Sequence, residues 1–586
     1  MNAGPVIPLH VNFSHEDKAA KGLRSLREQA APQEPVYFTA REMALSTPRM
    51  LLDGERGAGK TVLARGLAQE TGALLVEAGD ADAFAAWLER MPKARAYIVD
   101  GLDRLGEDGP RLVADFLSRL SDEAVLLLGD VETVRRWPLP AGFQMHALRP
   151  LSVEDRQAGL GGKATGAALS GPAGNPALFA IAQDVDTGVD SAERLIDAWA
   201  GADAQRVRDG FEAVARGTSR NRAVDDLLAA KHLSSLPADD VARLYLEAAD
   251  RWTPAVRSLL RRAPDMAEGL GRRMLDAGGD AARRGVLLVA AALDDASPLR
   301  QAVADALLAT IEEGRLAPFD RDAAARILSR RGDPRDLEAL CEVPGGAFTM
   351  GSDTNPNSRP VHRVEVSAFR IGRYPVTNAL YRRFVEATGR RWISPEATVP
   401  ERANAPAADL TWRDATAFCA WLTGRWRQEG RIGKDEIVRL PSEPEWERAA
   451  RGDQPDGGQA IVYPWGGGWD AQAANSEESG FNGPCAVGIF PAGRSPYGCD
   501  DMAGQVWEWT TTLWGDDMAT PHFAYPYRDD GREDPEAGPS IRRVLRGGCF
   551  SSGRQKACCT YRGSLEPDGF WRGNGFRVAV AKMGPR

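Results

Sequence analysis

The sequence predicts a multidomain protein with an α/β domain, an all-α region and a C-terminal domain of short strands and irregular loops. Its 586 residues are too many for one hydrophobic core, because cores stop growing beyond roughly 250–300 residues. A glycine-rich motif stands between an apolar strand pattern and a helical pattern at residues 49–70, as in an α/β unit. Near residue 339 an Ala-, Leu- and Arg-rich composition gives way to a Trp-, Gly- and Pro-rich one. The predicted divisions are a polar N-terminal segment (1–46) and domains at 47–165, 166–338 and 339–586.

Composition and charge narrow the classes of partner. The chain has 73 Lys and Arg against 82 Asp and Glu, and this net charge of −9 gives no general basis for binding nucleic acid. No apolar run reaches the length of a membrane span, and the first residues lack the apolar core of a signal peptide, so we expect a cytoplasmic protein that contacts no membrane. The seven cysteines show no pair of Cys-x-x-Cys motifs, and we expect reduced, mostly buried thiols.

A glycine-rich motif carries the most specific functional signal. It reads Gly54-Glu-Arg-Gly57-Ala-Gly59-Lys60-Thr61, directly after the first apolar strand and before a helix. This spacing predicts a loop whose backbone amides surround phosphate oxygens at the positive end of the helix. The three glycines allow the tight backbone path. Lys60 neutralises the β- and γ-phosphates as a catalytic residue, and Thr61 holds Mg²⁺. The motif therefore predicts an ATP and Mg²⁺ site.

An acidic pair follows the next apolar strand, which covers residues 96–100. The segment Asp100-Gly-Leu-Asp103 stands where a parallel strand ends, at the sheet edge that binds ligands. We expect Asp100 to hold Mg²⁺ together with the P-loop threonine, whereas Asp103 either positions a water or caps the next turn. Both are catalytic candidates. A third apolar strand, 124–128, leads to Arg135 and Arg136, which either sense a γ-phosphate or lie on a solvated helix face.

The order of these motifs resembles the signal-transduction ATPases with numerous domains (STAND), the P-loop switch proteins used by NACHT-type immune receptors. Two shorter segments fit the same order, His146-Ala-Leu-Arg-Pro-Leu-Ser152 and Gly174-Asn-Pro176. In that class the first segment links to a lid and the second touches the nucleotide. The resemblance implies an α/β P-loop NTPase domain at 47–165.

The region from 166 to 338 shows helical periodicity with short breaks at Asp, Gly and Pro. It predicts an all-α lid or linker, with helices at 241–249, 255–261, 285–293 and 302–311.

The C-terminal region carries six Gly- and aromatic-rich motifs, at Val343–Gly351, Pro360–Val366, Gly372–Asn378, Arg439–Arg451, Tyr463–Gly466 and Asp501–Trp509. Together they strongly resemble the formylglycine-generating-enzyme-type domain, a variant of the C-type-lectin fold. The resemblance implies an α+β domain at 339–586.

Formylglycine-generating oxidases bind copper through two cysteines a few residues apart, shortly after an Arg-Gly-Gly motif, and soft thiolates suit Cu(I). In this chain Cys549 follows Gly548 directly, whereas Cys558 and Cys559 are adjacent and would point to opposite sides of an extended segment. We therefore expect a C-terminal domain without catalytic activity, and a copper-dependent oxidase is the alternative.

Members of this family also bind Ca²⁺ through an Asp/Asn-x-x-Gly-x-x-Trp-Glu segment. The resemblance implies a site in which Asp501 and Glu508 supply carboxylate oxygens and Gly504 and Val506 supply backbone carbonyls. Gln505 stands where Asn is common. Plain turn and core roles for these residues are equally open.

The segment 546–578 has no steady period and is framed by Arg546-Gly-Gly548 and Gly575-Phe-Arg577, with Pro567-Asp568 between them. It resembles the variable proteins of diversity-generating retroelements, whose lectin-fold C-terminus carries replaceable residues between such frames. Tyr, Trp, Ser, Gly and Arg are typical of adaptable binding surfaces; an invariant surface loop is the alternative. The ligand-binding candidates are Ser551, Ser552, Gly553, Tyr561, Gly563, Ser564, Leu565, Gly569, Phe570, Trp571, Arg572 and Gly573.

The leading hypothesis is an ATP-dependent ligand sensor. The surface at 550–573 binds a ligand, most simply a protein, and the P-loop domain couples this event to ATP binding, hydrolysis, self-assembly or an effector protein. One alternative is a copper-dependent oxidase fused to an ATPase. Another is a passive binding module whose nucleotide is structural.

Overall fold

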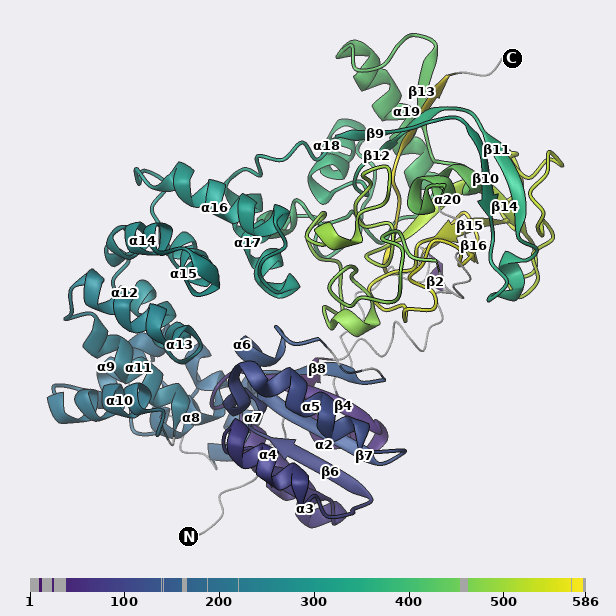
Figure 1. Ribbon diagram of the computed structural model, residues 1–586. Coiled ribbons are helices and arrows are strands. Elements are labelled where there is room, and N and C mark those ends of the chain that lie inside the picture. The colour runs from purple at the N-terminus through teal and green to yellow at the C-terminus, as the bar shows by residue number, and fades with distance from the viewer. Residues whose placement is uncertain are drawn as a thin grey trace. The chain divides into compact units, whose positions relative to one another are not determined.

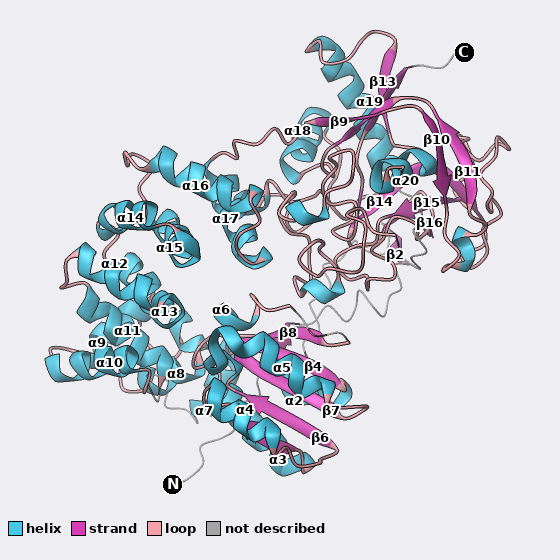
Figure 2. Cartoon of the chain, viewed as in Figure 1, coloured by secondary structure: helices cyan, strands magenta, loops and turns pink. Residues whose placement is uncertain are grey.

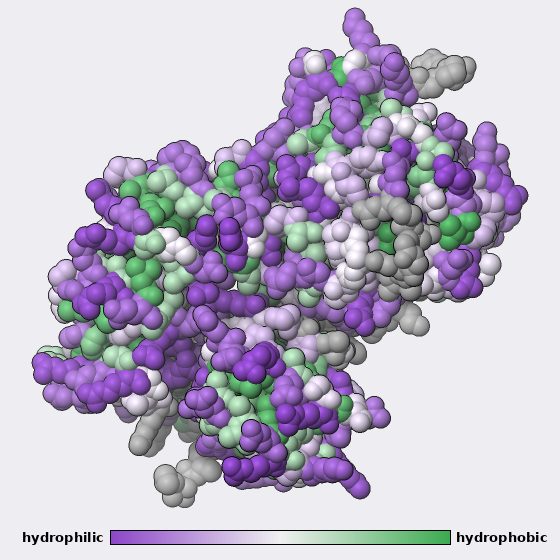
Figure 3. Space-filling model, in the orientation of Figure 1, coloured by the Kyte–Doolittle hydropathy of each residue, from purple (hydrophilic) through white to green (hydrophobic). Residues whose placement is uncertain are grey.

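The computed structural model describes residues 10–12, 24–25, 38–138, 140, 142–160, 166–186, 188–219, 221–453, 462–570 and 572–582. They fall into two compact units, one drawn from residues 1–13 and 36–307 and the other from 14–35 and 308–586. Figures 1 and 2 label most of their helices and many of their strands. On the face shown in Figure 3 hydrophilic residues predominate, and hydrophobic ones appear in small patches. Within the described ranges, no helix is long and apolar enough to cross a membrane.

The first unit contains a seven-stranded sheet in the order β3-β1-β8-β4-β7-β6-β5. The five strands from β8 to β5 run parallel, and β1 pairs antiparallel with β8 and with β3. The strands are β1 (His10–Asn12), β3 (Phe38–Thr39), β4 (Arg49–Gly54), β5 (Leu74–Glu77), β6 (Ala96–Asp100), β7 (Ala124–Asp130) and β8 (Gln144–Leu148). The strands predicted at 49–53, 96–100 and 124–128 are confirmed. The sheet also takes in β1 and β3 from the N-terminal polar segment.

Both faces of this sheet are covered, which explains the unbroken apolar runs of its strands. Successive side chains of a strand point to opposite faces. Leu51 and Leu127 accordingly join one buried cluster, whereas Leu52 and Leu128 join another. The covering helices are α2 (Ala40–Ser46), α3 (Lys60–Thr71), α4 (Ala81–Glu89), η1 (Leu102–Asp108), α5 (Gly109–Ser118) and α6 (Val131–Val134). Helix α7 (Val153–Leu160) packs instead with the helical part of the unit.

The remainder of the first unit is helical, as predicted. Its elements are η2 (Gly171–Gly174), α8 (Pro176–Ala182), α9 (Ala192–Ala200), α10 (Ala204–Arg216), α11 (Arg222–Leu233), α12 (Ala238–Glu247), α13 (Ala249–Arg262), α14 (Met266–Ala277), α15 (Gly279–Ala292) and α16 (Arg300–Glu312). The four helices predicted from periodicity correspond to α12, α13, α15 and α16. The boundary between the two units lies within α16, between Leu307 and Leu308.

The second unit begins before residue 339, because α17 (Pro318–Arg331) packs on the domain that follows it. The backbone amide of Ala486 donates a 2.8 Å hydrogen bond to Asp322 Oδ1 on this helix. Phe319 stacks on Phe481 with 4.0 Å between ring centroids. The last helix of the region assigned to the linker is therefore part of the C-terminal unit.

The second unit is α+β. It has two four-stranded sheets, β13-β19-β12-β9 and β16-β15-β14-β18, a β10-β11 hairpin, and a pairing of β17 with β2 (Arg24–Ser25). Its strands are β9 (Leu340–Val343), β10 (Gly346–Met350), β11 (His362–Val366), β12 (Phe369–Gly372), β13 (Glu436–Arg439), β14 (Trp507–Gly515), β15 (Arg542–Arg546), β16 (Gly563–Leu565), β17 (Gly569–Phe570), β18 (Asn574–Gly575) and β19 (Ala579–Lys582). The α-helices are α18 (Asn378–Thr388), α19 (Trp412–Gln428) and α20 (Glu443–Arg451), and the 3-10 turns are η3 (Pro356–Ser358), η4 (Pro400–Arg402), η5 (Glu477–Ser479) and η6 (Pro491–Gly493).

Local sequence explains the helix starts and the aromatic content of this unit. Helices α19 and α20 each begin at a capping box, Thr411 with Asp414 and Ser442 with Glu445, which satisfies amides that the first turn leaves open. Four tryptophans are fully buried, at 426 on α19, 446 on α20, and 509 and 514 on β14. Large rings contribute much apolar area where regular elements are short.

Candidate functional sites

The glycine-rich motif forms a tight loop between β4 and α3. Gly57 and Gly59 adopt φ values of +81° and +88°, which side-chain-bearing residues rarely adopt. A Cβ on Gly57 would also lie 2.7 Å from the methyl carbon of Ala177 on α8. Among the residues that the structure describes, none accepts a hydrogen bond from the backbone amides of Gly59, Lys60 and Thr61. Amides at the start of a helix form an anion-binding site when they are left open in this way.

Lys60 stands at the first position of α3, and its side chain is about 10% exposed. Its Nζ donates to the carbonyl oxygens of Gly54 (2.7 Å) and Glu55 (2.8 Å) and lies 3.0 Å from Asp130 Oδ1. Asp130 is the last residue of β7, the strand between β4 and β6. Asp130 was not predicted as a site residue, although an acid at the end of a buried parallel strand is a recognisable signal.

The predicted magnesium ligands lie side by side. Thr61 Oγ1 donates a 2.6 Å hydrogen bond to Asp100 Oδ2 at the end of β6. A hydroxyl beside a carboxylate suits Mg²⁺, which takes few protein oxygens and keeps several waters, so these residues fit the ion. Asp103 has a different position: its Oδ1 accepts a 3.1 Å hydrogen bond from the backbone amide of Asp130 and its other oxygen pairs with Arg222. Both contacts are with distant residues and not with the turn that follows Asp103, so the capping role considered for it is not seen.

Helices of the first unit also contact the loop. Asn175 caps α8, and its Nδ2 donates to the carbonyl of Arg56 (2.8 Å). Ala177 N donates to the carbonyl of Gly57 (3.2 Å). Arg56, inside the motif, forms an ion pair of 2.8 Å with Asp226 on α11. The Gly174-Asn-Pro176 segment thus lies against the loop that is predicted to hold phosphate.

Arg135 and Arg136 form ion pairs with acidic residues, which was not predicted from the sequence. Arg135 pairs with Asp53, and Arg136 Nη1 lies 3.0 Å from Asp250 Oδ1 on α13. The arginines that approach the predicted site are instead Arg56 and Arg222, the first residue of α11. They also line a polar cleft of about 850 Å³ beside Asp103. No local pattern marks Arg222, because it comes from a distant helix.

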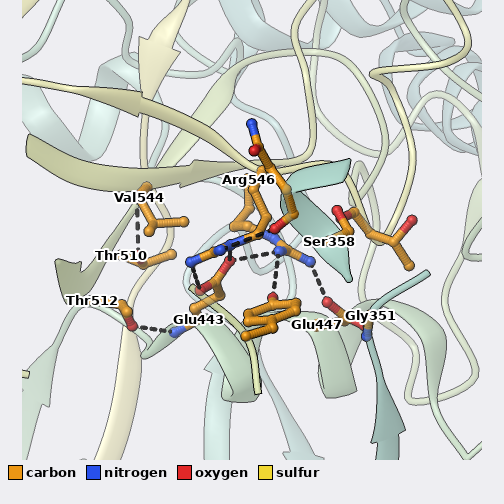
Figure 4. A network of polar contacts seen from close by, with 12 residues as sticks. Gly351, Ser358, Glu443, Glu447, Thr510, Thr512, Val544 and Arg546 are labelled. Carbon is orange, nitrogen blue, oxygen red and sulfur yellow. Dashed lines mark hydrogen bonds and ion pairs between the residues drawn. The ribbon is translucent and has the colours of Figure 1, made fainter. Parts of the chain in front are cut away.

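In the second unit, Arg546 of the Arg-Gly-Gly motif lies in a buried charge network (Figure 4). Its Nη1 donates to Glu443 Oε1 (2.7 Å) and its Nη2 to Glu447 Oε2 (2.5 Å), both on α20. Arg562 Nε donates to the same oxygen of Glu443 (2.6 Å). The four side chains are closed to solvent, so the network fixes both Arg546 and Arg562 as scaffold within the predicted variable segment.

The predicted ligand-binding residues differ in exposure. Arg572 is exposed, and six are partly exposed: Ser551, Gly553, Tyr561, Gly563, Ser564 and Gly569. Ser552, Leu565 and Gly573 are buried, which corrects the prediction for these three. Leu565 packs in the main core, Ser552 Oγ accepts from the amide of Cys549, and Gly573 lies against Phe550. Trp571 and the side chain of Phe570 lie outside the described residues.

The most exposed part of the segment is Arg554-Gln-Lys556, which was not predicted, although three successive long polar residues between small ones are a signal. Two aromatic groups flank it. Lys556 Nζ lies 5.8 Å from the ring centre of Tyr561, which packs against Trp507 at 5.9 Å. Tyr463 donates to the carbonyl of Arg554 (3.1 Å) and stacks on Trp465. We call the loop surface the set Trp465, Trp507, Ser551, Gly553, Arg554, Gln555, Lys556, Tyr561 and Arg572.

The C-terminal part of the chain matches a known protein family. Residues 329–582 match the family described as the sulfatase-modifying factor enzyme 1-like domain. A mouse relative named inactive C-alpha-formylglycine-generating enzyme 2 is 30% identical over 310 residues, covering 42% of this chain and 87% of that protein. The chain belongs to this family. The resemblance to formylglycine-generating-enzyme-type domains is thereby confirmed.

Two further proteins are similar to part of the chain. Hercynine oxygenase of Mycolicibacterium smegmatis is 34% identical over 245 residues, 36% of this chain and 53% of that protein, so the chain spans about half its length. The solved structure of Treponema denticola variable protein 1 is 21% identical, with a TM-score of 0.32 over 41% of this chain and 94% of that one.

Cys549 and Cys558 have separate hydrogen-bond partners in the structure. Cys549 Sγ lies within hydrogen-bonding distance of the Ser551 hydroxyl (3.3 Å), whereas Cys558 Sγ donates to the carbonyl of Gln555 (3.5 Å). Burial raises the pKa of both thiols. Cu(I) binding needs thiolates that face each other, whereas each of these thiols is hydrogen-bonded to a residue close to it in sequence.

The residues expected to bind calcium do not fit that ion. Glu508 accepts from Arg577 with both oxygens and from Trp446 Nε1 (2.7 Å). Asp501 Oδ2 accepts from the amide of Gly488 (2.7 Å), and burial, reinforced by Asp500, raises its pKa to about 7. Calcium requires several charged or carbonyl oxygens at one point. The described residues contain no group of three or more His, Cys, Asp or Glu side chains that could hold a metal.

Proposed function

We propose that this protein is an ATP-dependent ligand sensor, in which nucleotide at the P-loop controls the helices packed on it. The observation that carries the proposal is the contact between the loop and α11. Arg56 of the loop pairs with Asp226, and Arg222 pairs with Asp103 and Asp130. A polyphosphate bound to Lys60 and the loop amides would enter this set of charges, and it would therefore favour one arrangement of α11 over another.

Three features support ATP with Mg²⁺ as the nucleotide. The loop follows a buried parallel strand and opens a helix, Lys60 is directed into the loop, and Thr61 adjoins Asp100. The P-loop NTPase class, with the helical region as its lid, accounts for all three. We assign ATP and Mg²⁺ as cofactors, Lys60 and Asp100 as the residues nearest the reacting phosphate, and hydrolysis as a step for experiment to establish.

The ligand site of this proposal is the loop surface, and a protein is its ligand. The loop surface combines aromatic rings with adaptable polar side chains, the composition of antibody-like binding surfaces. Its position on a rigid base supports the same assignment, since Arg546 and Arg562 are held by Glu443. We further propose that these exposed positions are the ones that a diversity-generating retroelement would vary.

Hydrogen–deuterium exchange tests the coupling within the first unit. Exchange at α11 (Arg222–Leu233) is compared with and without Mg·ATP in the wild-type protein and in Lys60→Ala. We expect ATP to change exchange at the start of α11 in the wild type only. A wild-type protein that binds ATP while α11 exchanges identically would rule out a switch and leave a structural nucleotide.

A further inference from the structure

Three cationic side chains converge on the carboxylate of Asp130, which is 4% exposed. Lys60 Nζ lies 3.0 Å from Oδ1, Arg56 Nε lies 3.0 Å from Oδ2, and Arg222 Nη1 lies 3.3 Å from Oδ2. Burial alone would raise the pKa of Asp130, but Lys60, Arg222 and Arg56 lower it below its ordinary value. The carboxylate is therefore ionised at neutral pH and bound on both oxygens.

The three cations come from different parts of the first unit. Lys60 begins α3, Arg56 belongs to the loop, and Arg222 begins α11. A buried cluster of positive charge needs an anion, because unpaired charges inside a protein cost several kcal/mol. Asp130 supplies that anion beside a phosphate-binding lysine and next to backbone amides that have no acceptor among the described residues.

We propose that Asp130 is an internal stand-in for phosphate: it binds the three cations when no nucleotide is present and so determines the nucleotide affinity of the site. In this proposal Arg222, the first residue of α11, contacts the bound phosphate. This inference rests on the proposed nucleotide site. When a polyphosphate binds, its oxygens take over Lys60, Arg56 and Arg222 from the carboxylate. The negative charge of Asp130 then opposes the phosphate, so the carboxylate weakens nucleotide binding.

The direction in which nucleotide affinity changes when Asp130 is removed distinguishes this role from other roles of an acidic residue. A residue that binds Mg²⁺ or positions a water would strengthen nucleotide binding, and its removal would weaken it. Removal of a competing anion does the opposite. Glu193 on α9 provides a matched control, because it is also a buried acid of the first unit but pairs with Arg261 and Ser258 on α13, whereas Asp130 pairs with Lys60, Arg56 and Arg222.

The experiment measures the affinity for ATP and for pyrophosphate in the wild type, Asp130→Asn, Glu193→Gln, Lys60→Ala and Arg222→Gln by calorimetry. We expect Asp130→Asn to bind both probes at least about tenfold more tightly than the wild type, with Glu193→Gln changed by less than about threefold. In an Asp130→Asn background, Arg222→Gln should reverse most of the gain. Asp130→Asn that binds no more tightly than the wild type, including the case in which neither binds, overturns the inference.

A second measurement, of melting temperature with and without pyrophosphate, tests the proposal if Asp130→Asn folds poorly. Asp130→Ala removes the carboxylate that Lys60, Arg56 and Arg222 share, so pyrophosphate should raise its melting temperature by more than that of the wild type. Equal shifts would contradict the stand-in role. Failure of the proposed function gives a different result, because wild-type and Lys60→Ala proteins would then bind ATP equally.

Discussion

Arg577 Nε lies 2.7 Å from Glu508 Oε2, and Arg577 Nη2 lies 2.8 Å from Glu508 Oε1, in a pair that is closed to solvent. The pair joins Gly575-Phe-Arg577, the motif that ends the segment 546–578, to β14. It holds the C-terminal end of the segment as Arg546 holds its start. It also commits Glu508 to a structural role.

Replacing Glu508 by Gln should destabilise the second unit by about 3–5 kcal/mol, because Arg577 is left buried without a counter-charge. Unfolding in urea, followed by tryptophan fluorescence, measures the loss. The matched control is Asp568→Asn, which breaks the exposed pair with Arg413 and should cost less than about 1 kcal/mol. Equal costs for the two variants would contradict the role of the buried pair.

Replacing Asp501 by Asn should remove a pH dependence of stability. Burial, with Asp500 nearby, raises the pKa of Asp501 from 3.8 to about 7, although Arg577 and Arg335 act in the other direction. The folded protein holds this proton more tightly than the unfolded chain, so the contribution is present at low pH and is lost as pH rises from about 4 through about 7.

Above pH 7 we expect Asp501→Asn to be more stable than the wild type by up to about 4 kcal/mol. Asn is also tolerated at the φ of +59° that this position adopts. Urea midpoints at pH 5 and pH 8 give the comparison. A difference between the two proteins that stays constant with pH would show that Asp501 is not the titrating group.

Copper titration should reveal no stoichiometric Cu(I) site in the second unit. Cys549 and Cys558 are buried thiols with raised pKa and separate partners. Competition with a chromophoric Cu(I) chelator should give the same result for the wild type, Cys549→Ser and Cys558→Ser. One tight equivalent of Cu(I) that disappears in both variants would support the oxidase alternative instead.

Sequencing the locus and its flanks in a clonal population tests the proposed variation. We expect a nearby near-repeat of the segment coding for residues 546–578, with differences confined to adenines. Substitutions should fall on the loop surface, such as Arg554, Lys556 and Arg572, and should spare Arg546 and Arg562. Substitutions spread evenly over buried and exposed positions would indicate ordinary genetic drift in a loop that is not diversified.

Some of these features follow from local sequence and others do not. Lys60, Thr61 and Asp100 were predictable because a short motif or a strand end fixes each position. Arg222 was not, since it reaches the site only through the packing of α11. In the segment 546–578 the two framing motifs were recognisable from the sequence, but Leu565 and Ser552 were predicted to lie on the surface and are buried. An irregular segment has no period that separates inward from outward side chains, so burial there depends on tertiary contacts such as the Arg546 network.

The most direct test of an ATP-dependent switch is equilibrium binding of Mg·ATP to the wild-type protein and to Lys60→Ala. Lys60 lies within the loop, where its Nζ contacts Gly54, Glu55 and Asp130. We predict saturable one-to-one binding by the wild type and a loss of at least about a hundredfold in affinity for Lys60→Ala. Equal affinity in the two proteins, or no binding by either, would contradict the account.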